Sequence, residues 1–165
     1  MQNDSDITLT YIRQVLSYCP TTGMFVWKER KTRQDLIGHV AGSTGSHGYL
    51  AISVFNRKRL AHRLAWFYVT GKWPSAHIDH IDGNKSNNCF ANLREVTRFE
   101  NLQNMRQANK RNKTRLLGVS AHQGKWRVQI MTQGQRIRVS GFNTPEEAHQ
   151  KYLLLKRKFH LTCTI

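Results

Sequence analysis

The sequence has few cysteines and few acidic residues, and it has no long apolar run. Its three cysteines are scattered without a C-x-x-C pair. This argues against a disulfide framework and a thiolate zinc site, and it favours a reducing cytosol. No apolar run approaches the roughly 20 residues of a membrane span, so no membrane partner is expected. The polar, acidic N-terminus, MQNDSDITLT, does not have the pattern of a secretory signal.

The shortage of acidic residues leaves a large positive charge. Twenty-six Lys and Arg residues stand against ten Asp and Glu residues, which gives a net charge of +16 over 165 residues. A field of this size attracts polyanions, of which nucleic acid is the usual one. Because 39% of the residues are hydrophobic and the mean hydropathy is −0.59, we expect a soluble globular protein with a modest core. Because of its net charge, we expect this protein to bind nucleic acid.

The charge is distributed unevenly along the chain. Residues 1–104 carry a net charge of +5, whereas residues 105–165 carry +11. The break falls in residues 105–115, a polar and basic stretch without an apolar face, which is typical of a linker. We therefore predict two modules, residues 1–104 and 116–165, of which the second is the more basic.

Short elements are expected in the first module. Composition and periodicity predict helices at Leu9–Leu16 and Ala61–Gly71, strands at Met24–Lys28, Tyr49–Phe55 and Asn92–Thr97, and a basic hairpin turn at Asn56–Arg59. Thr97 and Glu100 have the spacing of a capping box, which predicts a helix from about Arg98. The local order around residues 77–104 is therefore strand, long polar loop, short strand and helix.

The second module has a strand pattern with two different faces. Residues 125–130 and 136–140 alternate between apolar and polar side chains, and a capping box at Thr144 predicts a helix with one apolar stripe. A small sheet is thus expected to cover this helix with its apolar face. Its other face presents Lys125, Arg127, Gln129, Arg136, Arg138 and Ser140. A two-stranded ribbon of this kind fits the DNA major groove, although a solvated sheet face is the alternative.

Residues 77–88, HIDHIDGNKSNN, are rich in imidazole, carboxylate and amide groups, and some of these groups could take part in the hydrolysis of a phosphodiester. Hydrolysis requires an activated water and a positive group that neutralises the charge developing on phosphate. A neutral imidazole such as His80 can supply the first, and a hard divalent cation held by a carboxylate and an amide oxygen can supply the second. Asp79 and Asn101 offer those oxygens, provided that the helix folds back onto the first strand.

The stretch HIDHIDGNKSNNCFANLREVTRFENLQN (residues 77–104) resembles the HNH homing endonucleases of phages and introns, which are ββα-metal nucleases. About a dozen positions follow the pattern D-H-x-D-G-N-x-x-x-N-x-x-x-N-L-R-x-V-T-x-x-x-N of that family. LSYCPTTGMFVWK and LAHRLAWFYVTGKWP upstream are also similar to it. The resemblance implies an α+β fold with a ββα-metal core at about residues 60–104.

The same resemblance implies a role for each matching residue. His80 would be the general base, and Asn92 would tie the loop and orient that base. Asp79 and Asn101 would ligate the metal. Asn101 stands where other branches of the family have histidine, which favours Mg²⁺, with Mn²⁺ as a substitute, over a His-rich transition-metal site.

The C-terminal module resembles the ethylene-response-factor type of DNA-binding domain, on the stretches GVSAHQGKWRVQI and GFNTPEEAHQKY. That resemblance implies a three-stranded antiparallel sheet packed on one helix. Phage nucleases of this type often carry such a module. The chain is therefore interpreted as a phage-encoded protein that acts on double-stranded DNA in the cytoplasm of a bacterial host.

Other interpretations of the same residues stay open. The chain could be a DNA-binding regulator that keeps the nuclease fold only as a scaffold, or it could cleave structured RNA, because basic faces bind either backbone. Asp82 is interpreted as a turn residue before Gly83, and His62 as a packed or hydrogen-bonded helix residue. The target sequence, the number of strands cut and the oligomeric state do not follow from the sequence.

Overall fold

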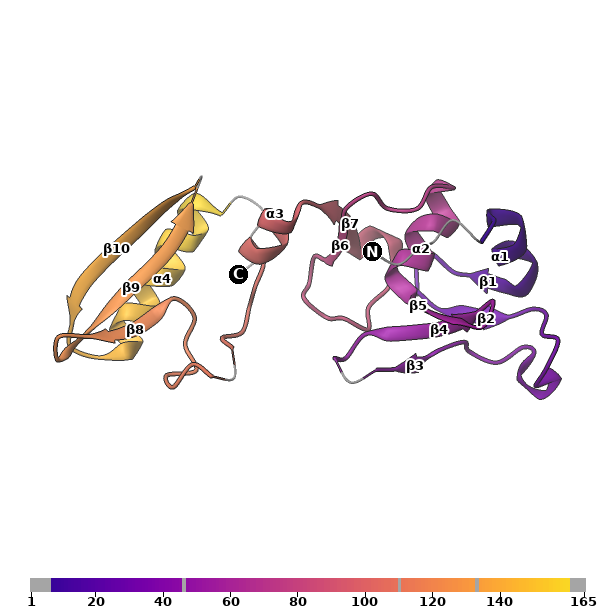
Figure 1. Cartoon of the computed structure of the whole chain (residues 1–165), viewed down its shortest axis with the longest axis horizontal. Coiled ribbons are helices and arrows are strands. Elements are labelled where there is room, and N and C mark those ends of the chain that lie inside the picture. The colour runs from indigo at the N-terminus through magenta and orange to yellow at the C-terminus, as the bar shows by residue number, and fades with distance from the viewer. Residues whose placement is uncertain (1–6, 46, 110, 133, 161–165) are drawn as a thin grey trace. The chain divides into compact units, whose positions relative to one another are not determined.

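The computed structural model describes residues 7–45, 47–109, 111–132 and 134–160 (Figure 1). It combines helices with small antiparallel sheets, which confirms the predicted α+β class. The chain forms two compact units, residues 1–97 and 98–165. In the described residues no helix is long and apolar enough to cross a membrane.

The described residues of the first unit form three small antiparallel sheets. Its elements are α1 (Leu9–Val15), β1 (Leu16–Tyr18), β2 (Phe25–Trp27), η1 (Gln34–Leu36), β3 (Ser43–Thr44), β4 (Leu50–Val54), β5 (Arg57–Leu60), α2 (Ala61–Thr70), β6 (His77–His80), η2 (Phe90–Asn92) and β7 (Leu93–Val96). Strand β1 pairs with β2, β4 lies between β3 and β5, and β6 pairs with β7.

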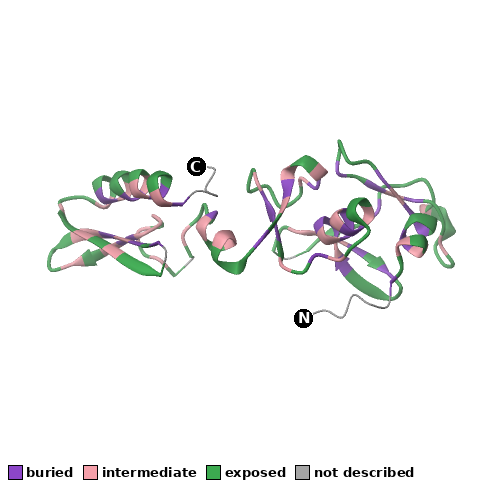
Figure 2. Cartoon of the chain, turned by 90° about the horizontal axis from the view of Figure 1, so that it is seen from above, coloured by how far each residue is buried: buried purple, intermediate pink, exposed green. Residues whose placement is uncertain are grey.

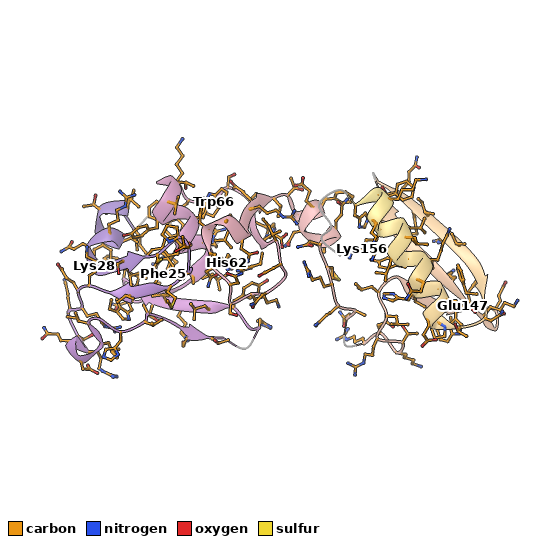
Figure 3. The ribbon with its side chains drawn as sticks, turned by 180° about the vertical axis from the view of Figure 1, so that it is seen from behind. Phe25, Lys28, His62, Trp66, Glu147 and Lys156 are labelled. Carbon is orange, nitrogen blue, oxygen red and sulfur yellow. The ribbon has the colours of Figure 1, made fainter. Side chains whose placement is uncertain are left out.

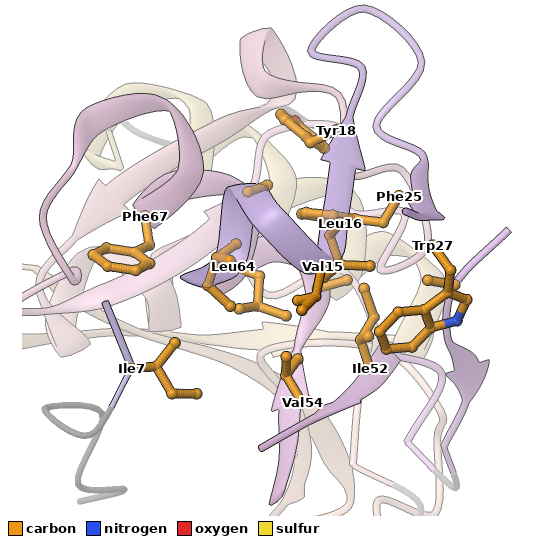
Figure 4. Close-up of a cluster of buried hydrophobic side chains, with 14 of the residues drawn as sticks. Ile7, Val15, Leu16, Tyr18, Phe25, Trp27, Ile52, Val54, Leu64 and Phe67 are labelled. Atoms are coloured by element: carbon orange, nitrogen blue, oxygen red, sulfur yellow. The ribbon is translucent and has the colours of Figure 1, made fainter. Parts of the chain in front are cut away.

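Helix α2 packs on strands β4 and β5 and closes the core of the first unit. Its Leu64 is fully buried together with Ile52 of β4, Leu16 of β1 and Phe25 of β2 (Figure 4). Each such side chain contributes about 1.5–3 kcal/mol through removal of apolar surface from water. The helix ends where Gly71 adopts a left-handed conformation with φ 73°, as the terminal glycine predicted.

The predicted hairpin turn at Asn56–Arg59 is wrong. The turn consists of Phe55 and Asn56, which have φ values of 52° and 57°, and Arg57 already pairs with Val54 as the first residue of β5. A two-residue turn with both φ angles positive matches the twist of the flanking strands, so the shorter connection forms. The basic residues therefore lie on a strand.

The second unit places one helix on one face of an antiparallel sheet. It contains α3 (Arg98–Gln103), β8 (Val119–His122), β9 (Lys125–Thr132), β10 (Gln135–Phe142) and α4 (Pro145–Phe159), with the strand order β10-β9-β8. The apolar face of the sheet and the inner side of α4 form the buried core (Figure 2). Ala148 and Tyr152 of α4 are buried against Val119, Val128 and Ile130.

Helix α4 begins at the capping box that the sequence predicted. The Thr144 hydroxyl accepts the backbone N–H of Glu147 at 3.1 Å, and the Glu147 carboxylate accepts the N–H of Thr144 at 3.4 Å. These bonds satisfy donors that the first helical turn leaves without partners. Near the other end of the helix, the buried Lys156 ammonium donates to the carbonyl of Met105.

Gly118 should be far more sensitive to substitution than Gly124. Both residues have positive φ, but a Cβ at Gly118 would overlap the Tyr152 ring, whereas a Cβ at Gly124 would meet nothing within 4 Å. We expect Gly118→Ala to lower the free energy of unfolding of the second unit by about 2–4 kcal/mol, and Gly124→Ala by about 1 kcal/mol. Urea unfolding followed through the Trp126 indole resonance measures both; equal losses would contradict this prediction.

Candidate functional site

The candidate site is built on the two-stranded ribbon of β6 and β7. The predicted order of strand, polar loop, short strand and helix is confirmed by β6, residues 81–92, β7 and α3. In the antiparallel register Asp79 lies opposite Arg94, and His80 lies opposite Leu93. Asp79 and His80 are both buried, so the ribbon brings a carboxylate and an imidazole together at the start of the polar loop.

Asp79 is paired with Arg94 across the ribbon. Its Oδ2 atom accepts a hydrogen bond from Arg94 Nε at 3.0 Å and another from Nη2 at 2.8 Å. The side chains are only 10% and 24% exposed, respectively, so this charge-assisted pair is largely removed from water. Sequence reasoning assigned no role to Arg94, because its partner depends on the register between the two strands.

His80 is held by a side chain of the loop that follows it. Its Nε2 atom lies 3.1 Å from Oδ1 of Asn88, a fully buried residue. Asn88 donates through Nδ2 to the carbonyl of Ser86 at 3.2 Å, which turns the acceptor Oδ1 toward the histidine. Nε2 is therefore the protonated nitrogen, and the basic lone pair is on Nδ1. Asn88 lies in the polar motif, but its contact with His80 does not follow from sequence spacing.

The electrostatic environment keeps His80 neutral. Burial lowers its pKa, because the charged imidazolium loses hydration. The hydrogen bond to Asn88 and the carboxylates of Asp82 and Asp79 oppose this shift without reversing it. A neutral imidazole with its lone pair on Nδ1 is the protonation state that a general base requires.

Asn92 closes the polar loop, which is consistent with the tying role that the family resemblance implies. Its Nδ2 atom donates to Asp82 Oδ1 at 3.0 Å and to the carbonyl of Asn87 at 2.8 Å, while its Oδ1 accepts the N–H of Asp82 at 3.0 Å. Gly83 has φ 75°, so it supplies the positive φ expected of this turn. Asp82 thus acts within the loop as the hydrogen-bonding turn residue that the sequence predicted.

Strand β1 and the turn that follows it contact the backbone of the same loop. The Tyr18 hydroxyl donates to the Asn88 carbonyl at 2.7 Å, and the Phe90 N–H donates to the Pro20 carbonyl at 2.8 Å. Gly23 packs so closely on the backbone of Asn88 and Cys89 that a Cβ there would overlap it. Residues that are about 70 positions away in sequence therefore fix the backbone that carries the partner of His80.

Two further aromatic rings lie beside His80. The His62 ring is 5.0 Å from it at an interplanar angle of 79°, and the Tyr49 ring is 6.0 Å from it. His62 is 5% exposed, and burial, followed by the nearby His80 and Arg63, lowers its pKa to about 3. The prediction that His62 is packed is confirmed, but within the described residues its buried Nδ1 has no hydrogen-bond partner.

The two predicted metal ligands are both oxygen donors. Asp79 supplies carboxylate oxygen, and the predicted second ligand, Asn101, supplies amide oxygen, which is the chemistry that Mg²⁺ prefers. No group of three or more His, Cys, Asp or Glu residues that could hold a metal occurs in the described residues. Asn101 lies on α3 in the second unit, and its place at the metal remains a prediction.

The six predicted DNA-contacting residues share one face of the sheet in the second unit. The register pairs Arg138 with Gln129 and Ser140 with Arg127, and directly paired residues of antiparallel strands project on the same side. The apolar residues between them, Val128 and Ile130, are buried toward α4. The polar face is therefore a candidate nucleic-acid interface formed by Lys125, Arg127, Gln129, Arg136, Arg138 and Ser140.

The neutral, buried His62 should make the first unit less stable in acid. Its pKa rises from about 3 when folded to the ordinary 6.5 when unfolded. The associated stability is therefore fully present above pH 6.5 and is lost as the pH falls toward 3, by up to about 1.4 kcal/mol per pH unit. Urea unfolding between pH 7 and 5 should show a steeper loss for the native protein than for His62→Phe; parallel curves would contradict this assignment.

The part of the chain that forms the candidate site is similar to a known protein family. Residues 59–103, from β5 to the end of α3, match the sequence model of the HNH endonuclease family. A solved structure described as "DNA binding and cleavage by the HNH homing endonuclease I-HmuI" is similar, with a TM-score of 0.43 and 21% identity over 87% of this chain and 80% of that chain. No curated protein matches the chain. The segment that contains Asp79, His80, Asn92 and Asn101 is thus similar to HNH endonucleases, which supports nuclease activity.

Proposed function

We propose that this protein is a divalent-metal-dependent DNA endonuclease of the HNH homing type. The observation that carries the proposal is the state of His80, which is buried, neutral and bound through Nε2 to Asn88, directly after Asp79. This arrangement lies inside the segment that matches the HNH endonuclease family. It is the arrangement that a water-activating base requires next to a cation ligand.

In the proposed reaction the Nδ1 atom of His80 accepts a proton from water. The resulting hydroxide forms a bond to phosphorus while the bond from phosphorus to the leaving oxygen breaks. Asn88 stabilises the imidazolium that forms, because its Oδ1 continues to accept a hydrogen bond from Nε2. Asn92 keeps the loop closed around this pair through its bonds to Asp82 and Asn87.

Asp79 and Asn101 would hold the divalent cation, with Mg²⁺ as the expected ion and Mn²⁺ as a substitute. The bound cation would neutralise charge at the phosphate and the leaving oxygen. Arg94 contributes from this chain by holding the Asp79 carboxylate through two hydrogen bonds to Oδ2, which orients that carboxylate.

The basic sheet face of the second unit would position double-stranded DNA. Its four cations and two hydrogen-bonding side chains project from β9 and β10 on the side away from α4. Three strands packed on one helix support the proposed likeness to ethylene-response-factor domains. A phage-encoded enzyme that acts in the cytoplasm of a bacterial host is part of the same proposal.

Cleavage of supercoiled plasmid tests the proposed function. With Mg²⁺ or Mn²⁺ the native protein should convert plasmid to nicked or linear forms, and EDTA should stop the reaction. Loss of the base should lower the rate at least about 100-fold in His80→Ala, while DNA affinity stays the same. If the native protein binds DNA but leaves plasmid intact with every metal, the protein is a DNA-binding regulator instead.

Removing two arginines from the sheet face should weaken DNA binding much more than removing two cations from the helix. We expect Arg136→Ser combined with Arg138→Ser to lower affinity at least about tenfold and to reduce the slope of log K against log salt by about 2. The matched control, Lys151→Ser with Arg157→Ser, removes the same charge from exposed positions of α4. Equal losses in the two double variants, measured by fluorescence anisotropy, would show that only net charge matters.

A further inference from the structure

Three aromatic rings meet inside the first unit, although they come from distant parts of its sequence. His62 lies in the first turn of α2, Tyr49 immediately precedes β4, and His80 ends β6 (Figure 3 labels His62). The ring centroids of His62 and His80 are 5.0 Å apart, those of Tyr49 and His62 are 5.2 Å apart, and those of Tyr49 and His80 are 6.0 Å apart. The imidazole of His80 is therefore packed against two rings as well as bonded to Asn88.

The orientation of the His80 ring matters for its proposed role as a base. The bond to Asn88 holds Nε2, and rotation about the soft χ2 torsion sets the direction of the ring plane. Such a rotation would move the lone pair of Nδ1 away from the water that it must deprotonate. The edge-to-face contact with His62, at an interplanar angle of 79°, opposes this rotation because the turning ring would collide with its neighbour.

Tyr49 supports His62 and links it to the catalytic loop. The Lys85 ammonium lies 4.7 Å from the centre of the Tyr49 ring and also donates to the carbonyl of His47 at 3.0 Å. Lys85 belongs to the same loop that carries Asn88. The loop thus holds His80 directly through Asn88 and indirectly through Lys85 and the two rings.

Stability alone does not account for an imidazole at position 62. Within the described residues, the buried Nδ1 of His62 makes no hydrogen bond, and a buried polar atom in that state costs about 1–3 kcal/mol. An apolar side chain of similar size would avoid this cost. What the position does provide is a planar ring against His80.

We propose that His62, supported by Tyr49, is a positioning residue that holds the plane of the His80 imidazole for proton abstraction. This inference rests on the proposed nuclease function and adds to it a residue outside the catalytic loop. His62 acts through its ring contact with His80.

Two apolar substitutions separate the ring from its nitrogen atoms. His62→Leu and His62→Phe both remove the buried nitrogen, but only Phe keeps a planar ring. We expect His62→Leu to lower kcat about 10- to 100-fold at unchanged KM, and His62→Phe to restore kcat to within about threefold of the native value. Equal activity of both variants, or equal loss in both, would overturn the proposal.

The mobility of the His80 ring can be measured without DNA or metal, so this test of the positioning role does not depend on cleavage. Carbon-13 relaxation of the His80 Cδ2–Hδ2 bond should give a lower order parameter in His62→Leu than in the native protein, with His62→Phe at the native value. A second pair, Tyr49→Leu and Tyr49→Phe, should follow the same order, which provides the test if a His62 variant does not fold. Unchanged relaxation in both leucine variants would overturn the proposal. If the relaxation differences occur but the native protein does not cleave DNA, only the proposed nuclease function is overturned.

Discussion

The hydrogen bond from His80 Nε2 to Asn88 Oδ1 is the interaction on which the candidate site depends. It selects the tautomer, because the nitrogen that donates to the amide cannot also be the base. Several parts of the first unit hold the Asn88 side-chain amide in position. Asn92 closes the loop from within, and Tyr18 and Gly23 hold the Asn88 backbone from the N-terminal side. The N-terminal strands are therefore part of the scaffold of the site.

Burial favours the neutral form of His80, because the charged imidazolium would lose hydration. Asp79, the preceding residue of the same strand, is buried as well, and Arg94 places two charge-assisted hydrogen bonds on its carboxylate. The ribbon thus sets a neutral imidazole beside a carboxylate that is paired with a guanidinium.

The cationic face of the second unit depends on a local pattern, the alternation of apolar and polar residues along its strands. Each strand alternates apolar and polar residues, so burial of Val128 and Ile130 against α4 automatically turns Arg127 and Gln129 outward. The antiparallel register then sets Arg138 beside Gln129 and Ser140 beside Arg127. A dense cationic face results from strand geometry and one covering helix, without any special loop.

The sequence by itself determined those helices and strands that depend on interactions between residues close together in the chain. Alternation predicted the strands of the second unit, and the capping box predicted the start of α4 at Thr144. Composition and the capping spacing of Thr97 and Glu100 predicted the order of strand, loop, strand and helix around Asp79 and His80, and the family resemblance implied a ββα-metal core there. The turn at Phe55 was missed because pairing of the flanking strands, rather than residue preference, decided its length. Tertiary structure alone decided the partners of the site. Arg94 meets Asp79 through strand register, and His62 meets His80 through the packing of α2. Such contacts depend on which buried surfaces fit together in space, and sequence spacing does not encode that fit.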